Sequence, residues 1–362
     1  MKVTFPHMGE TYIALKGFFE DLGVDVVIPP ECNKKTLQIG VKYSPETACL
    51  PLKVNIGNYV QSIENGADTI VITGSCGPCR FGYYGILEKE ILRDMGYDVD
   101  MIVFDPPSED IGRFISRIRK ITNNKPVYKV ADSLYKGYRI AKELDDMNKM
   151  MFAIRPREIK KGEVRRIYGE YQKEIEKAHG TREIFKVIDD NKKKLKDVRI
   201  DADRKVLKVG IIGEIYTVIE PFVNLYIEEK LGDMGVEVDR SMNVSEWIET
   251  NMFSKLLGFN SERDIDKAAE NYLKTAIGGH AKQCIGNAVL YSRKGFDGLI
   301  QLLPFSCMPE IVASSILPSV SRNEKIPIMT LVLDELTGES GYITRLEAFV
   351  DMLGIRKETK VE

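Results

Sequence analysis

The sequence predicts an α/β protein in which two related parallel-sheet units are joined by a helical region. Short β-branched or apolar runs alternate with longer amphipathic segments at both ends of the chain, a pattern typical of βαβ units. Residues 108–200 contain no convincing strand pattern. An internal similarity indicates a duplicated unit, because residues 66–79 and 295–309 both read Gly-x-Asp, an apolar run, Ser-Cys and then proline. The alternation predicts mainly parallel sheets with right-handed crossovers.

The first predicted unit covers residues 1–107. Apolar or β-branched runs that stop at Pro, Gly or Asp predict its strands at 1–5, 24–28, 67–73 and 98–104. Helices are expected between and after these strands, where apolar residues recur at helical spacing, at 11–22, 35–41, 51–64 and 81–95.

The predicted helical region covers residues 108–204. Apolar residues fall on one helical face in two segments, and charged residues occupy the other faces. The two sets are Val164, Ile167, Tyr168, Tyr171 and Ile175, and Ile184, Phe185, Ile188 and Leu195. The lysine run at 192–194 is interpreted as a solvated helix face rather than a nucleic-acid patch.

The second predicted unit covers residues 205–362. Its strands are expected at 205–212, 236–239, 299–303 and 326–333. Helices are expected at 220–234, 245–257, 263–276, after Cys284, at 309–320 and at 344–353.

Composition excludes several classes of protein. The 362 residues suffice for two or three domains with substantial cores. The net charge of −2 provides no strong field toward nucleic acid or an anionic membrane. No apolar run approaches the ~20 residues that span a bilayer, and the N-terminal residues lead into a strand without the apolar core of a signal peptide. We therefore expect a cytoplasmic protein.

Cysteines mark the ends of predicted elements in both halves. Cys76 and Cys79 lie between a strand and a helix, and Cys307 takes the same place in the second half. Cys49 and Cys284 lie upstream of them at similar range. Helix N-termini favour thiolates, and the carboxyl ends of parallel strands are the usual ligand-binding edge. We interpret these cysteines as metal or cluster ligands, the alternative being small buried hydrophobes.

Cys32 is a sixth candidate ligand, although it has no counterpart in the second half. It lies in the exit loop after the predicted strand at 24–28. The Cys-x-x-C pair at Cys76 and Cys79 also fits dithiol exchange, but the chain is much too long for a thioredoxin-like fold. A zinc site usually takes two closely spaced pairs, which the second half lacks. Iron–sulfur clusters accept thiolates from scattered loops, which favours a cluster.

Candidate proton donors and acceptors lie in predicted loops at the same sheet edges. They are His7, Glu46, Glu214, Tyr216, His280 and Glu310. Each could act near a cluster, and each could instead be a structural residue such as a helix cap. His179 lies in the charged helical region and is interpreted as a surface residue.

Nucleotide-binding and hydrolase motifs are absent from the sequence. It contains no Walker A, Gly-x-Gly-x-x-Gly or Gly-x-Ser-x-Gly pattern. The segment 213–217, Gly-Glu-Ile-Tyr-Thr, faintly resembles a phosphate loop, but the carboxylate of Glu214 would repel a phosphate. Nucleotide binding by this chain therefore has no support from motifs.

Several segments resemble a known family over nearly the whole chain. They are 43–51 (Tyr-Ser-Pro-Glu-Thr-Ala-Cys-Leu-Pro), 66–79, 213–216, 304–310 (Pro-Phe-Ser-Cys-Met-Pro-Glu) and 344–349. The chain resembles uncharacterised proteins related to 2-hydroxyacyl-CoA dehydratase and its activator. Some of these carry names such as CoA-substrate-specific enzyme activase or 2-hydroxyglutaryl-CoA dehydratase, D-component-like. No acyl-CoA pocket of the dehydratases is identifiable in this sequence.

The resemblance implies two Rossmann-like domains with an iron–sulfur cluster at their junction. Relatives hold either a double-cubane [8Fe-9S] cluster through six cysteines or one [4Fe-4S] cluster through three, and the six thiols here match the former. The resemblance also implies a separate ATP-hydrolysing activator of the sugar kinase/actin type, itself an iron–sulfur protein. The activase label fits that partner, because this chain shows no phosphate loop.

The leading hypothesis is an iron–sulfur reductase component of an anaerobic metabolism. Its cluster would accept a low-potential electron from the activator and pass it to a small-molecule substrate. The alternatives are a 2-hydroxyacyl-CoA dehydratase subunit and a non-catalytic carrier or scaffold for a cluster. Homodimer formation is left open.

Overall fold

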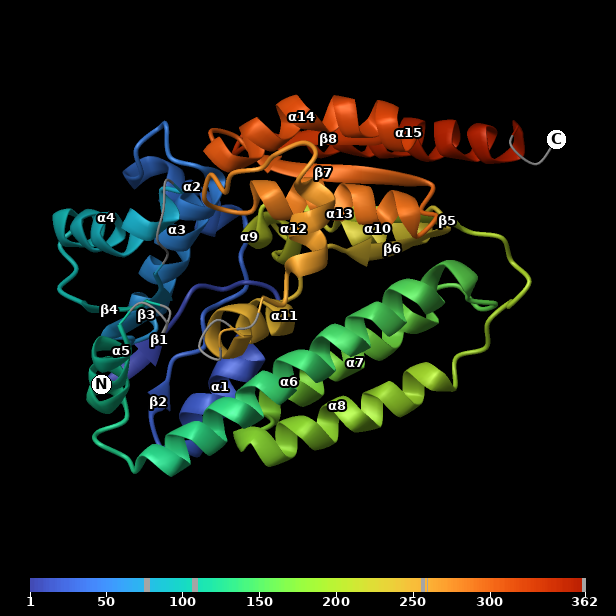
Figure 1. The fold of residues 1–362 in the computed structure, drawn as a ribbon. Coiled ribbons are helices and arrows are strands. Elements are labelled where there is room, and N and C mark those ends of the chain that lie inside the picture. Colours follow the sequence, from blue (N-terminus) through green and yellow to red (C-terminus); the bar gives the residue numbers. More distant parts are fainter. Residues whose placement is uncertain (75–78, 106–109, 255–257, 259, 360–362) are drawn as a thin grey trace. The chain divides into compact units, whose positions relative to one another are not determined.

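The computed structural model describes residues 1–74, 79–105, 110–254, 258 and 260–359 (Figure 1). The chain packs into two compact units. The first comprises Met1–Asp145, Ile175–Ile188 and Val244–Ser261, and the second comprises Asp146–Glu174, Asp189–Asn243 and Glu262–Glu362. Both units therefore contain parts of the helical region, and the three-part division expected from the sequence stays a prediction.

The first unit is built on a parallel sheet of four strands in the order β2-β1-β3-β4. The strands are β1 (Lys2–Thr4), β2 (Asp25–Val26), β3 (Thr69–Thr73) and β4 (Asp100–Phe104). Successive strand residues face opposite sides of a sheet. Ile70 packs in a core with residues of α3 (Leu50–Glu64) and α4 (Phe81–Asp94). Val71 packs in another with residues of α1 (Thr11–Asp21), so helices cover both faces.

The second unit repeats this topology with the order β6-β5-β7-β8, again all parallel. Its strands are β5 (Leu207–Gly213), β6 (Val236–Arg240), β7 (Gly298–Pro304) and β8 (Ile328–Leu333). On one face Leu299 packs with residues of α13 (Ala281–Arg293) and α14 (Met308–Glu324). On the other, a Cβ at Gly298 would lie 2.7 Å from Leu353 of α15 (Glu339–Thr359). The expected fold class of two Rossmann-like parallel-sheet units is confirmed.

The duplication extends to individual hydrogen bonds. In the first unit the backbone N–H of Lys2, at the start of β1, donates to the Asp68 carboxylate at 2.8 Å. In the second, the N–H of Lys208 donates to the Asp297 carboxylate at 2.8 Å. Each aspartate follows a glycine with positive φ by two residues, at Gly66 and Gly295. The Gly-x-Asp motif therefore ends one helix and ties the next strand to the first strand of its sheet.

A close helix crossing is also repeated. A Cβ on Gly57 of α3 would lie 1.8 Å from the carbonyl oxygen of Thr36 in α2 (Lys34–Tyr43). One on Gly286 of α13 would lie 2.3 Å from the carbonyl oxygen of Ile265 in α12 (Arg263–Ala269). Only glycine lets the two backbones approach this closely. The two crossings are therefore equivalent parts of the two units.

These equivalent pairs correct one expectation about the cysteines. One fixed offset along the chain relates all of these pairs. It takes Thr36 to Ile265, Gly57 to Gly286 and Asp68 to Asp297. The same separation makes Asn55 the counterpart of Cys284. The expected correspondence between Cys49 and Cys284 is therefore wrong. Cys49 caps α3, whereas Cys284 lies one turn inside α13.

The helical region is formed by α5 (Ile111–Ile121), α6 (Val127–Ile154), α7 (Glu163–Lys177) and α8 (Gly180–Lys196). An isolated bridge between Glu158 and Ile200 is the one β-type pairing in its described residues. The apolar faces predicted for the segments that form α7 and α8 are buried or half-buried. None of the helices in the described part of the chain is long and apolar enough to cross a membrane.

Several predicted helices differ from the observed ones. Of the helix expected at 220–234 only α10 (Ile227–Asp233) forms, because Leu225 and Tyr226 adopt left-handed conformations just before it; a separate short helix, α9 (Ile215–Ile219), precedes the expected range. The helix expected at 245–257 consists of α11 (Val244–Ile248) and a π-helical segment, η2 (Glu249–Ser254), with 255–257 outside the described residues. The helix expected at 263–276 ends at Ala269.

Candidate functional site

Helix α3 positions the candidate site of the first unit. Every residue from Leu50 to Ser62 is buried, so protein surrounds the helix on all sides. Cys49 is its N-cap residue and Pro51 occupies its first turn, where proline is tolerated. Polar residues in such a helix need internal partners, because water cannot reach them. Those partners define the site.

Asn58 of α3 ties two exit loops together. The backbone N–H of His7, after β1, donates to the Asn58 side-chain oxygen at 3.1 Å. The Asn58 amide donates to the carbonyl oxygen of Pro30, after β2, at 2.8 Å. Asn58 itself is fully buried. The loops after two adjacent parallel strands are therefore held to one helix, at the sheet edge where α/β proteins bind ligands.

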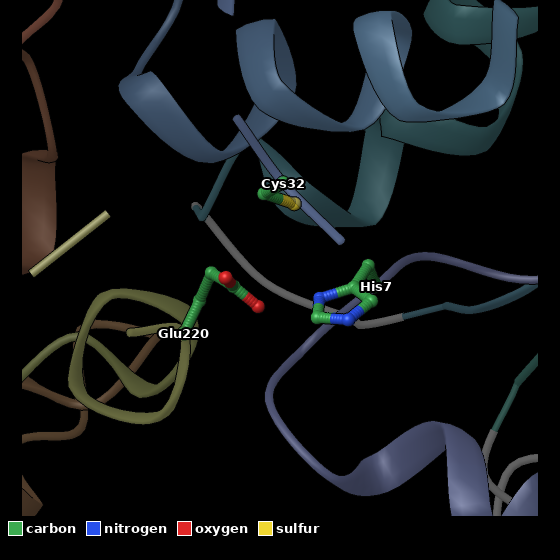
Figure 2. Close-up of side chains that lie close together, drawn as sticks. All are labelled: His7, Cys32 and Glu220. Carbon is green, nitrogen blue, oxygen red and sulfur yellow. The ribbon is translucent and has the colours of Figure 1, made fainter. Parts of the chain in front are cut away.

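His7 and Cys32 are brought together by these loops. A ring nitrogen of His7 and the sulfur of Cys32 lie within 4.8 Å of each other, and both side chains are buried (Figure 2). The His7 ring stacks on Tyr12 with 5.8 Å between the ring centroids. Imidazole nitrogen and thiolate sulfur are both ligands of zinc and iron. Figure 2 also draws Glu220, which belongs to the second unit and is described with it below.

Cys49 lies beside the start of α4. Its sulfur hydrogen-bonds the hydroxyl of Tyr84, in the first turn of that helix. The guanidinium of Arg80 donates to the carbonyl oxygen of Thr47 at 2.9 Å. These two contacts join the Cys49 loop to the segment that carries Cys79, which is half-buried. Burial and the neighbouring Cys49 raise the pKa of the Tyr84 hydroxyl above its usual value.

Cys76 lies outside the described residues, so the Cys-x-x-Cys pair is seen only through Cys79. The described cysteines, Cys32, Cys49, Cys79, Cys284 and Cys307, form no disulfide with one another. Cysteines outside disulfides, at the ends of strands and the starts of helices, are a suitable donor set for a metal or an iron–sulfur cluster.

A buried carboxyl lies one helical turn beyond Tyr84. Glu88 is fully buried in α4 and accepts a hydrogen bond from the Asn55 amide at 3.4 Å, and it also interacts with the Tyr59 hydroxyl. Burial raises the pKa of Glu88 to about 8. A carboxyl in this environment is largely protonated at neutral pH. Glu88 was not expected from the sequence.

The second unit holds a thiol and carboxyl group at the corresponding helices. Cys284 of α13, Cys307 at the N-cap of α14 and Glu310 in its first turn are all buried. Burial raises the pKa of Glu310 to about 7, and the proximity of Glu214 adds to that rise. Burial, Glu310 and then Cys307 raise the pKa of the Cys284 thiol. Cys284 and Cys307 as ligands and Glu310 as a proton donor or acceptor stay predictions.

Glu214 caps a helix. Its carboxylate accepts hydrogen bonds from the backbone N–H groups of Tyr216 and Thr217 at 3.0 and 2.9 Å, and from the Thr217 hydroxyl at 2.8 Å. Burial raises its pKa, although these hydrogen bonds oppose the rise. The carboxylate occupies the N–H groups that a phosphate would need, so the faint phosphate-loop pattern has no phosphate site. Glu220, at the other end of α9, is buried and accepts from the N–H of Phe222 at 3.3 Å.

The other candidate residues differ in their burial. Tyr216 is buried in α9, and His280 is the half-buried N-cap residue of α13, where its side chain makes no capping bond. Glu46 is exposed in the turn before Cys49. His179 is exposed and lies 3.1 Å from Glu20, which confirms it as a surface residue. Catalytic roles for Tyr216, His280 and Glu46 remain predictions.

Sequence reasoning missed Asn58, Tyr84 and Glu88. One signal was present, since polar residues recur in the otherwise apolar helix at 50–64. A polar side chain in a fully buried helix is usually retained for a specific hydrogen bond.

Fold and site together define an α/β protein of two duplicated parallel-sheet units, in which the described cysteines lie outside disulfides and near strand exits and helix starts. Residues 6–72 match a family described as CoA enzyme activase uncharacterised domain (DUF2229). The matched segment contains His7, Cys32, Cys49 and Asn58. This match supports a relationship to the activase and dehydratase-related family. No curated protein matches the chain.

Proposed function

We propose that this chain is an iron–sulfur protein that serves as the low-potential reductase component of an ATP-dependent system. Cys32, Cys49, Cys76 and Cys79 of the first unit and Cys284 and Cys307 of the second are its candidate ligands. A bound cluster supplies one-electron chemistry at a potential that its protein surroundings adjust. A double-cubane [8Fe-9S] cluster fits six thiolates, and a [4Fe-4S] cluster is the smaller alternative.

The observation that carries this proposal is the joining of the Cys49 loop to the start of α4. Tyr84 bonds the Cys49 sulfur and Arg80 bonds the Thr47 carbonyl oxygen. The Cys49 loop and the segment that carries Cys79 therefore meet at the N-terminus of α4. Backbone N–H groups and the helix dipole there favour anionic sulfur. Dithiol exchange would need only the Cys-x-x-Cys pair and gives no reason for Cys49 to lie there.

The first test is metal content. The chain purified without oxygen should be brown and contain iron with acid-labile sulfide. Iron near eight per chain supports the double cubane, and iron near four supports one cubane. Stoichiometric zinc without iron would contradict the cluster assignment. Cys49→Ser should lose iron, whereas Ser44→Ala, a substitution in the same loop that removes no thiol, should keep it.

The second test concerns the electron source. We propose a separate ATP-hydrolysing activator, because the chain carries no nucleotide motif and Glu214 blocks the one loop with a phosphate-like pattern. Mixing the protein with such an activator, a reductant and ATP should reduce the cluster, as followed by its visible spectrum. Equal reduction without ATP would remove the reason for this partner.

A 2-hydroxyacyl-CoA dehydratase subunit is the second candidate, and the match over residues 6–72 favours it. The two functions differ in substrate. Dehydration of a 2-hydroxyacyl-CoA by the reduced protein, with or without a second subunit, would favour the dehydratase. A cluster that transfers to an apo-acceptor in place of either reaction would identify a carrier.

A further inference from the structure

A run of positive charge occupies α5 and the start of α6 in the first unit (Figure 1). Residues 111–131 contain six lysines and arginines and no aspartate or glutamate, whereas the whole chain has a net charge of −2. We call this stretch the basic segment. Its cations are Arg113, Arg117, Arg119, Lys120, Lys125 and Lys129. The segment therefore has a local positive field that the overall composition conceals.

The ion pairs of the basic segment divide its cations into two groups. Three of them approach aspartates at the start and at the exit of β4. The other three, Arg119, Lys125 and Lys129, are exposed and form no ion pair with any residue that the structure describes. Their charges do not hold the helix in place, so they are available to a partner molecule.

The apolar face of α5 is already used inside the protein. Phe114 packs edge-on against Phe104 of β4, with 5.5 Å between the ring centroids, and Ile121 is buried in the core on one face of the sheet. A helix that binds a lipid surface needs its apolar face free. Two further isoleucines of α5 lie outside this packing, with Ile111 51% and Ile115 38% exposed. This combination argues for a protein partner over a membrane.

A groove of about 370 Å³ lies along α5 and the turn that follows it. Its lining combines the apolar side chain of Ile115 with the cation of Arg119 and the amide of Asn123. Tyr128, in the first turn of α6, is 70% exposed. Exposed tyrosine and arginine around an apolar centre are typical of protein–protein interfaces.

The basic segment begins beside the strand exit that leads to Cys76. The backbone N–H of Gly74, at that exit, donates to the carbonyl oxygen of Phe104 at 2.7 Å. A Cβ on Gly74 would collide with Oδ1 of Asp105, whose Oδ2 accepts from Arg117 at 2.7 Å. Helix α5 is about 16 Å long, and an ordinary interface of about 800 Å² per partner spans more than that length. A protein bound on α5 therefore reaches the exit of β3.

We propose that the basic segment is the docking surface for an acidic face of the ATP-hydrolysing activator. Opposite charges bring the two proteins together, and Ile111, Ile115 and the groove provide the apolar contact that holds them. The identity of the partner rests on the proposed function, whereas docking itself does not require a bound cluster. Docking here holds the electron donor beside the segment that carries Cys76, and electron transfer becomes faster as the distance shortens.

The experiment measures binding of the purified activator to the full chain at low and high salt. Binding to the parent should weaken as salt rises, because salt screens exposed charges. Arg119→Glu and Lys129→Glu should each slow association about tenfold. The control Lys186→Glu makes the same charge change on α8, at an exposed lysine without an ion pair to the described residues, and should change the rate less than about twofold. Excess poly-glutamate peptide should compete with the activator.

Equal association rates of Arg119→Glu and Lys186→Glu, or an affinity that does not change with salt, would overturn the docking surface. Tighter binding of RNA or of phosphatidylserine vesicles than of the activator at physiological salt would overturn it as well. The iron content and ATP-dependent reduction of the parent decide the proposed function separately. An activator that binds through the basic segment but reduces no cluster supports the docking surface and contradicts the proposed function. Equal reduction of the parent and Arg119→Glu at limiting activator supports the proposed function and contradicts the docking surface.

Discussion

The buried carboxyl of Glu88 makes the stability of the first unit depend on pH in a calculable way. Burial raises its pKa from 4.5 to about 8. The folded state therefore holds a proton that the unfolded state releases above about pH 4.5. The stability that this proton provides is complete below pH 4.5 and is lost as the pH rises toward 8.

Glu88→Gln should remove this dependence, because the amide has the size of the carboxylic acid and does not ionise. One pKa unit corresponds to about 1.4 kcal/mol. Between pH 6 and pH 8, the parent protein should lose about 2 kcal/mol of unfolding free energy relative to the variant. Near pH 5, the two proteins should differ by less than about 1 kcal/mol, since the Asn55 contact is kept.

Urea unfolding followed by tryptophan fluorescence measures this difference. Trp247 is the single tryptophan of the chain and belongs to the first unit. Glu90→Gln is the control, because Glu90 lies on the same helix with an exposed ion pair to Arg93. It should change stability by less than about 0.5 kcal/mol at either pH. An equal gap between Glu88→Gln and the parent at pH 6 and pH 8 would refute the assignment of a raised pKa.

Three further predictions follow from the helix crossings and the site. Gly57→Ala should lower the free energy of unfolding by about 3 kcal/mol, because its Cβ would meet the Thr36 carbonyl oxygen. Gly169→Ala, where a Cβ would meet nothing within 4 Å, should raise it by up to about 1 kcal/mol. Equal effects in thermal or urea unfolding would contradict the close crossing. Asn58→Ala should cost about 2 kcal/mol and speed alkylation of Cys32, as read by mass spectrometry; unchanged labelling would mean that Asn58 does not hold that loop. Cys32→Ala should lower the iron content, and full iron with the parent spectrum would remove support for a six-thiolate double cubane.

The sequence was sufficient for the parallel-sheet units and most element positions, because periodicity and turn residues are local properties. It was also sufficient for the Gly-x-Asp repeat, whose hydrogen bonds are the same in both units. The helix prediction was wrong between residues 220 and 227, where Leu225 and Tyr226 take left-handed conformations that are uncommon for their residue types. Tertiary contacts decide such positions.

The candidate site likewise combines features set by local sequence with features set by long-range contacts. The sequence by itself placed the cysteines at strand exits and helix starts, because the order of elements along the chain determines which edge each loop occupies. Only the tertiary structure paired His7 with Cys32 through Asn58, since those hydrogen bonds join residues 51 and 28 positions apart. Only the tertiary structure showed that Glu88 and Glu310 are buried and that Cys284 corresponds to Asn55. The environment of a side chain depends on which helix packs over it, and pattern alone reads a charged residue in a helix as solvated.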